Sequence, residues 1–142
     1  CHEKDFLFYT THAADPLPAA VGRKVVEIVI RDRLADRARE LGDYLKSQLH
    51  DLQQRHALIG DIRGRGLLLG IELVADRQTK APAPETGAAV SRRCLELGAC
   101  LNISRRSMAG VFRLAPPLTV SRDEIDSAVA ILDQALGECG KA

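Results

Sequence analysis

The segment from Ile59 to Val74, IGDIRGRGLLLGIELV, is where the apolar pattern of the chain changes. Ile62 stands alone among polar residues and glycines, whereas the run from Leu67 to Val74 is apolar almost throughout. A short apolar run without helical spacing indicates a buried strand, and the glycines before it indicate a bulge. We therefore expect one strand around Ile62, a glycine-containing bulge, and a second, buried strand.

Upstream of this segment, apolar residues recur at helical spacing. The range Leu17–Arg31 predicts a first helix, and Pro18 suits its first turn. Asp32 is the expected N-cap of a second, longer helix over residues 33–56, in which leucines recur every few positions. Together the two helices form either a helical hairpin or one long bent helix.

Downstream, strand and helix patterns alternate. Residues 87–97 predict a helix closed by Gly98, and a short strand is expected on each side of a turn at 105–110. The capping-box pattern from Ser121 to Glu124 begins a last helix, whose apolar face contains Ile125, Val129, Leu132 and Leu136. This order predicts an α+β fold, with a mostly antiparallel or mixed sheet of three or four strands and helices on one face.

Length and composition indicate one compact domain. The chain has 142 residues, 46% of them apolar, and a formal net charge of +1. A near-neutral charge argues against a nucleic-acid or membrane-surface binder, and no apolar run approaches the roughly 20 residues of a membrane-spanning helix. The chain begins with Cys1 rather than methionine and has no signal-peptide pattern, so we expect a piece of a longer, cytoplasmic protein.

The cysteines and histidines show no metal-binding pattern. No CxxC pair is present, so we expect free thiols in a reducing compartment at Cys1, Cys94, Cys100 and Cys139. His50 and His56 fall on polar helix faces without ligand spacing, and we expect both to contact solvent.

Arg113 is the residue that most strongly suggests chemistry. It lies in a predicted strand between apolar neighbours, and Pro116 and Pro117 end that strand. A guanidinium in such a place must bind an anion, reach solvent, or be costly to bury. Two interpretations remain open: a clamp that binds a carboxylate through two parallel hydrogen bonds, and an ordinary surface salt bridge.

Two further polar clusters have simple structural interpretations. Arg63 and Arg65 alternate with glycines but match neither glycine-rich nucleotide-binding fingerprint, which favours structural arginines over a nucleotide site. The range Thr10 to Pro16 contains threonine, histidine and aspartate, and Asp15 is well placed to cap the following helix. No nucleophile lies at a recognisable spacing, so a hydrolase triad is unsupported.

Three segments together resemble the C-terminal part of class III (omega-type) aminotransferases, which use pyridoxal phosphate. They are FYTTHAADPLPAAVG at 8–22, IRGRGLLLGIEL at 62–73 and FRLAPPLTVSRDEID at 112–126. Within this family, the string THAADP at 11–16 is similar to that of the 2,2-dialkylglycine decarboxylases. The resemblance implies the small C-terminal domain of a fold-type I enzyme over residues 17–142, including a long interdomain helix, and a large-domain remnant over 1–16.

The resemblance also implies roles for individual residues. Arg113 would receive the substrate carboxylate, and Thr11 would bind the cofactor phosphate of a neighbouring subunit in a homo-oligomer. Thr11, Ala13 and Asp15 would provide oxygen ligands for a monovalent cation, potassium or sodium. Amino acids and keto acids are the implied substrates, and neither nucleic acid nor membrane is an implied partner.

The lysine that bonds to the cofactor in this family has no recognisable counterpart among Lys4, Lys24, Lys46, Lys80 and Lys141. We therefore expect the chain to be inactive alone and to need a large domain that carries such a lysine. The chain could belong to a decarboxylase that couples decarboxylation to transamination, or to another class III aminotransferase acting on omega-amino acids or amines. A non-enzymatic oligomerisation or binding domain is the third alternative. Arg105 and Arg106 are expected to be solvated rather than to alter substrate access.

Overall fold

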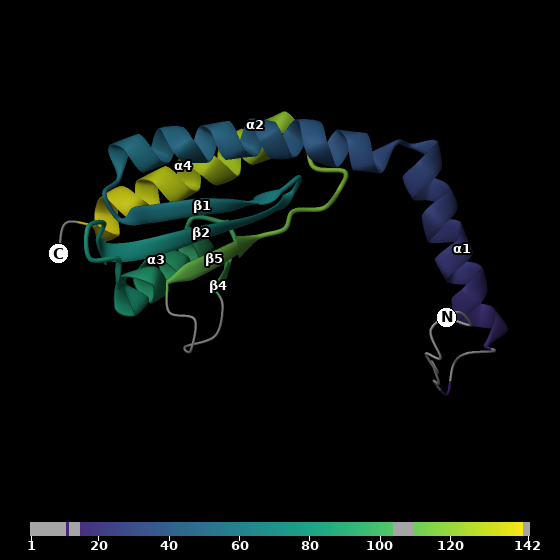
Figure 1. The fold of residues 1–142 in the computed structure, drawn as a ribbon, viewed down its shortest axis with the longest axis horizontal. Coiled ribbons are helices and arrows are strands. Elements are labelled where there is room, and N and C mark those ends of the chain that lie inside the picture. Colours follow the sequence, from purple (N-terminus) through teal and green to yellow (C-terminus); the bar gives the residue numbers. More distant parts are fainter. Residues whose placement is uncertain (1–10, 12–14, 104–109, 141–142) are drawn as a thin grey trace. The chain divides into compact units, whose positions relative to one another are not determined.

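The computed structural model describes residue 11 and residues 15–103 and 110–140, with Asn102 and Ile103 described by their backbone only. The chain divides into two compact units, Cys1–Ala35 and Asp36–Ala142, and each is described by itself. Figure 1 shows the helices and strands in chain order. Within the described ranges, no helix is both long and apolar enough to cross a membrane.

In the described part of the first unit, helix α1 extends over Pro16–Arg31, which confirms the predicted first helix. Asp15 is its N-cap, and a carboxylate oxygen of Asp15 accepts a hydrogen bond from the Leu17 N–H at 3.3 Å. Asp32 is the C-cap of the same helix, and its carboxylate accepts hydrogen bonds from Arg31. The prediction that Asp32 is the N-cap of the second helix is therefore wrong.

A left-handed residue separates the first two helices. Arg33 has a φ of 51°, so the first helix cannot continue through it. Helix α2 then extends over Leu34–Arg55, close to the predicted range 33–56. Neither glycine nor asparagine, which most readily take a left-handed conformation, stands at this position. The residue pattern therefore does not reveal where the break between the helices lies.

The second unit has the predicted α+β architecture. After α2, its elements are β1 (Ile59–Arg65), β2 (Leu68–Asp76), β3 (Ala81–Pro82), α3 (Pro84–Glu96), β4 (Asn102–Ile103), β5 (Val111–Leu114) and α4 (Arg122–Cys139). The sheet has the order β1-β2-β5-β4, the two-residue β3 pairs with β2, and all pairs of described strands are antiparallel. The predicted order of helices and strands is confirmed, with β3 as an addition.

The ends of the last two helices follow their capping residues. Helix α3 begins at Pro84 rather than Gly87, because proline suits a first helical turn, and Gly98 follows its end with a φ of 101°. Helix α4 begins with the predicted capping box. The Glu124 N–H donates to the Ser121 hydroxyl at 3.2 Å, and the Glu124 carboxylate accepts from the Ser121 N–H at 2.7 Å.

A tight turn that contains Gly66, rather than a bulge, connects β1 and β2. Arg65 pairs with Leu68, so residues 66–67 make a two-residue turn, in which Gly66 has a φ of 54°. The predicted bulge is therefore wrong here, and the shift in register lies at the start of β1 instead. Helix α2 packs directly on this turn, since a Cβ added to Gly42 would lie 2.2 Å from the Gly66 carbonyl carbon.

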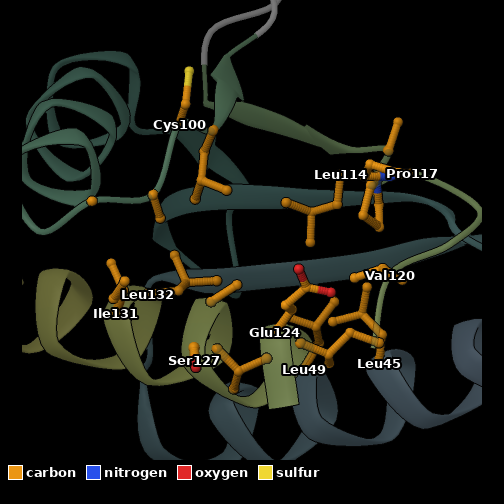
Figure 2. A pocket seen from close by; sticks show the side chains of 18 of the residues that line it. Leu45, Leu49, Cys100, Leu114, Pro117, Val120, Glu124, Ser127, Ile131 and Leu132 are labelled. Carbon is orange, nitrogen blue, oxygen red and sulfur yellow. The ribbon is translucent and has the colours of Figure 1, made fainter. Parts of the chain in front are cut away.

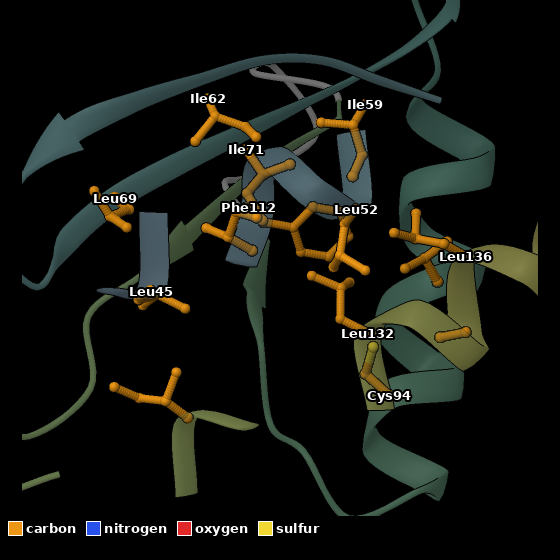
Figure 3. Close-up of a cluster of buried hydrophobic side chains, with 14 of the residues drawn as sticks. Leu45, Leu52, Ile59, Ile62, Leu69, Ile71, Cys94, Phe112, Leu132 and Leu136 are labelled. Carbon is orange, nitrogen blue, oxygen red and sulfur yellow. The ribbon is translucent and has the colours of Figure 1, made fainter. Parts of the chain in front are cut away.

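The core lies between one face of the sheet and helices α2, α3 and α4 (Figure 3). Strand residues that point into it include Ile62, Ile71 and Phe112, and they alternate along each strand with residues outside the core. The apolar face predicted for the last helix is confirmed, because three of its residues are buried and the fourth is partly buried: Ile125, Leu132, Leu136 and Val129.

The three described cysteines are free thiols. Cys94 is buried in the core, and burial raises the pKa of its thiol to about 11. Such a thiol stays protonated at neutral pH, so Cys94 packs as a small apolar side chain. Cys100 is exposed and Cys139 is half-buried.

His56 belongs to a polar cluster at the end of α2. Its side chain is 15% exposed, and its Nε2 lies 2.5 Å from the carboxylate of Asp133 on α4. Arg55 pairs with the same carboxylate. His56 is therefore only partly exposed rather than fully solvated, because a residue distant in sequence covers most of its side chain. His50 is exposed, as expected.

Replacing Asp133 with asparagine should destabilise the fold in a pH-dependent way. Partial burial alone would raise the pKa of Asp133, but hydrogen bonds from His56 and Arg55 outweigh it and lower the pKa below its usual value. A carboxylate with a lowered pKa in the folded state stabilises the fold above its unfolded pKa, and this contribution is lost as the pH falls through the folded pKa. We expect Asp133→Asn to cost about 1 kcal/mol at pH 7, less as the pH falls below about 4.

Urea unfolding at pH 7 and at several lower pH values measures this cost. Asp51→Asn, which changes an exposed carboxylate on α2, is the matched control and should alter the free energy of unfolding by less than about 0.5 kcal/mol. A cost for Asp133→Asn that stays constant through the acid range would contradict the assigned ion pairs.

Candidate functional site

Arg113 lies on the face of the sheet opposite the core. In β5, Phe112 points into the core, so the next residue points to the other face, and the Arg113 side chain is exposed. The ladder places Arg113 opposite Gly70 of β2 and opposite Asn102 of β4. This geometry explains how a strand of otherwise apolar residues carries an arginine without burying its charge.

A second arginine lies on the same face, on the other side of Gly70. Arg63 of β1 is opposite Gly70 in the register, and its guanidinium lies 2.5 Å from the carboxylate of Asp61 and 3.0 Å from that of Glu72. Hydrogen bonds to Asp61 and Glu72 raise the pKa of Arg63, and the bond to Asp61 has the larger effect. These ion pairs agree with the structural role expected of Arg63.

The segment after β5 is anchored by helix α2. The Arg37 guanidinium donates hydrogen bonds to three successive carbonyls, those of Leu118, Thr119 and Val120, at 3.2, 3.4 and 2.7 Å. The prolines just before these residues lack an N–H and restrict the backbone, so the chain leaves β5 in a fixed direction. Sequence reasoning missed Arg37, because its partners are backbone atoms 81 to 83 residues further along.

A pocket of about 780 Å³ lies on the helix side of the sheet, between α2, α4 and the segment after β5 (Figure 2). Its walls are mainly apolar and include Leu45, Leu49, Leu114, Val120 and Leu132. The carboxylate of Glu124, also in its wall, serves the capping box of α4, and hydrogen bonds from Ser121 lower its pKa. The pocket is thus an apolar cavity on the other side of the sheet from the Arg113 side chain, although Arg113 contributes to its border.

The other predicted site residues belong to the first unit. Thr11 is exposed, and the Asp15 carboxylate caps α1. Ala13 lies outside the described residues, as do Arg105 and Arg106. Among the residues that the structure describes, no group of three His, Cys, Asp or Glu side chains could hold a metal ion. The cation site expected from Thr11, Ala13 and Asp15, which also uses backbone oxygens, stays a prediction.

None of the three lysines in the described part of the chain lies on a strand. Lys24 is on α1, 3.4 Å from Glu27; Lys46 is on α2; and Lys80 is in the turn before β3. The structure therefore places an exposed arginine on the sheet, without a described lysine on the strands beside it. A reaction that needs such an amine would draw it from elsewhere.

Comparison with known proteins gives consistent matches over nearly the whole chain. Residues 8–136 match the family described as aminotransferase class III. An uncharacterised aminotransferase of Schizosaccharomyces pombe is 47% identical over 137 residues, which are 96% of this chain and 31% of that protein. The taurine–pyruvate aminotransferase of Rhodobacter capsulatus is 37% identical over 140 residues, covering 96% of this chain and 30% of that protein.

The fold has close counterparts among solved structures. The crystal structure of an aminotransferase from Bacillus anthracis matches with a TM-score of 0.84 and 34% sequence identity, over 94% of this chain and 30% of the other. The chain therefore spans about 30% of the length of the relatives and structures that it matches.

Proposed function

The chain belongs to the class III aminotransferase family, and we propose that it is the C-terminal domain of a pyridoxal-phosphate enzyme that couples decarboxylation of 2,2-dialkylglycines to transamination. In this proposal residues 17–142 form the small domain, and residues 1–16 belong to the large domain. The observation that supports it most is the position of Arg113, exposed on the open sheet face and anchored through the following segment. The string THAADP at 11–16 supports the decarboxylase over its relatives.

In this function Arg113 binds and orients the substrate. Its planar guanidinium donates two parallel hydrogen bonds to the substrate carboxylate, stays charged at all relevant pH values, and fixes the plane of that carboxylate. When bound, pyridoxal phosphate supplies the electron sink for the bond that breaks at the substrate's α-carbon. The orientation that Arg113 imposes on the carboxylate decides which bond to that carbon is aligned for breakage.

Thr11 and Asp15 would serve the cofactor from the edge of the site. An exposed threonine hydroxyl can donate a hydrogen bond to a phosphate, and we propose that Thr11 does so across a dimer interface. Carboxylate and carbonyl oxygens are hard ligands, which suit potassium or sodium at Thr11, Ala13 and Asp15. Each unit by itself offers a group of the right chemistry, a guanidinium for a carboxylate in one and a hydroxyl for a phosphate in the other, and the lysine that holds the cofactor would come from the large domain.

The alternative is a class III aminotransferase for amino acids or amines, in which Arg113 would bind a carboxylate equally well. The two activities differ in the first bond that breaks. A 2,2-dialkylglycine has no hydrogen on its α-carbon, so it can react only by losing carbon dioxide. An ordinary transamination begins instead with the loss of a proton from that carbon.

The experiment that separates them supplies the whole enzyme with 2-methylalanine and pyruvate. We expect one carbon dioxide and one acetone to be released for each alanine formed. Transamination of an amine or an omega-amino acid with no release of carbon dioxide from 2-methylalanine would favour the aminotransferase instead.

The chain by itself should self-associate, because one side of α1 is apolar and exposed. Leu17, Val21 and Val25 follow one another at helical spacing and are 73%, 57% and 53% exposed. Exposed apolar patches of this kind promote association. Light scattering over a concentration series should therefore show oligomers, and Val21→Glu combined with Val25→Glu should restore the monomer. A wild-type chain that remains monomeric at high concentration would contradict this expectation.

A further inference from the structure

We infer that Gly70 keeps the sheet surface beside Arg113 clear, so that the carboxylate end of the substrate can lie against strand β2. The inference rests on the proposed function of Arg113 and adds a residue that determines which substrates fit. It follows from the register of the sheet and from the space around each strand glycine.

Gly70 occupies the middle of a row of residues on the open face. It lies in β2, between β1 and β5, and is opposite Arg63 on one side and opposite Arg113 on the other. Its neighbours Leu69 and Ile71 point into the core, so a side chain at position 70 would project from the open face. Without that side chain only backbone faces outward at position 70, and a Cβ built there would lie 4.0 Å from Cγ of Arg63.

Other glycines of the β1–β2 hairpin are required by the packing of this chain. A Cβ added to Gly60 would lie 2.7 Å from Cγ1 of Val74, and one added to Gly64 would lie 2.2 Å from the carbonyl oxygen of Leu68. Gly64 also has a φ of 138°, which other residues rarely adopt. Both positions therefore exclude a side chain for reasons internal to the fold.

Gly70 differs from Gly60 and Gly64 in the space available for a Cβ, and from Gly64 in its φ. A Cβ at this position would come no closer than 3.7 Å to the Arg63 carbonyl oxygen and 3.9 Å to that of Phe112, which are ordinary contacts. Its φ lies outside the left-handed region. A glycine inside a strand weakens it relative to alanine, and it often marks a bulge, a bend or a place where another molecule or backbone approaches closely. Packing and backbone conformation within the described residues do not call for glycine at position 70, which leaves room for a molecule to lie against the open face there.

The charged groups beside Gly70 favour a carboxylate. Arg63 already binds the carboxylates of Asp61 and Glu72, which balance its charge on the β1 side. On the β5 side, the proposed function gives Arg113 the substrate carboxylate, and both guanidinium hydrogen bonds need that group close to the sheet. A side chain larger than hydrogen at position 70 would hold the substrate away from this position.

The test uses Gly70→Ala and Gly70→Val in the whole enzyme. Gly70→Ala should keep or raise Tm, because the added Cβ makes only ordinary contacts, and Gly70→Val should remain folded because valine has a high preference for strands. The KM for an amino acid should rise at least tenfold for Gly70→Val and less for Gly70→Ala, whereas kcat/KM for the matching amine, which lacks the carboxylate, should change less than threefold. Isobutyrate, a carboxylate without an amino group, should raise the Tm of the wild type but not that of Gly70→Val.

Gly137→Ala on α4 is the matched control. A Cβ there would lie 3.8 Å from His56, so this change should also keep or raise Tm, and it should leave the KM for amino acids unchanged. Unchanged amino-acid KM and an unchanged isobutyrate effect in Gly70→Val would overturn the inference. A lower Tm, with amino acid and amine affected alike, would mean that another protein segment covers Gly70 and would overturn it too. The proposed role of Arg113 is tested separately, by the effect of Arg113→Lys on kcat/KM for amino acids.

Discussion

Mixed with pyridoxal phosphate, the 142-residue chain alone is expected to form no stoichiometric covalent adduct and to show no aminotransferase or decarboxylase activity. The reason lies in the positions of its lysines. Among the residues that the structure describes, Lys24 and Lys46 lie on helices and Lys80 lies in a turn, so none of these three stands on a strand of the sheet that carries Arg113. Borohydride reduction followed by peptide mapping would detect any lysine that has bonded to the cofactor.

The same treatment of a whole class III enzyme that contains this chain is the positive control. It should yield one labelled lysine per subunit, located outside residues 1–142. Slow labelling scattered over surface lysines agrees with the expectation. A single labelled lysine within the isolated chain, in a one-to-one ratio, would show that the chain contains its own cofactor site.

Arg113→Lys in the whole enzyme is expected to lower kcat/KM for amino acids by about tenfold to a few hundredfold. Lysine keeps the positive charge but replaces a planar pair of donors with a single ammonium group, so the two parallel hydrogen bonds are lost. A hydrogen bond to a charged group contributes about 1.5–3 kcal/mol, which corresponds to this range of rates.

Arg65→Lys is the matched control for this change. Arg65 is also exposed, at the end of β1, but it stands at the hairpin turn rather than opposite Gly70. The control variant should retain wild-type kcat/KM for amino acids. If Arg113 formed only a surface salt bridge, its replacement would cost under about 1 kcal/mol of stability and would leave catalysis unchanged.

The helices and strands could be predicted largely because their signals are local. The recurrence of Ile125, Val129, Leu132 and Leu136 every three or four residues defines the buried face of a helix. The Ser121–Glu124 capping box defines where that helix begins. The antiparallel arrangement of β1 and β2 also follows from proximity, since two strands separated by a short turn must pair in this way.

Features that depend on distant residues could not be predicted. The left-handed conformation of Arg33 and the hydrogen bond between His56 and Asp133 have no local signature. The tight turn at Gly66 is specified partly by α2, which approaches it so closely that Gly42 cannot carry a side chain. In each case tertiary packing decides between alternatives that the local sequence leaves open.

The candidate site also contains one residue with a local sequence signal and others that depend on distant residues. Arg113 was recognisable because a charged residue interrupts an apolar strand, and this conflict is visible in the sequence alone. Gly70 and Arg37 were not recognisable. The importance of Gly70 appears only when the register sets it opposite Arg113, and that of Arg37 only when its hydrogen bonds to the segment after β5 are known.

The most direct test of the account is the ratio of kcat/KM for an amino acid to kcat/KM for the amine that lacks its carboxylate, measured for the wild type and for Arg113→Lys. If Arg113 binds the substrate carboxylate, this ratio should fall by about tenfold or more, because only the amino acid loses an interaction. An unchanged ratio, in a variant that is folded and retains its cofactor, would show that Arg113 is not the carboxylate-binding residue.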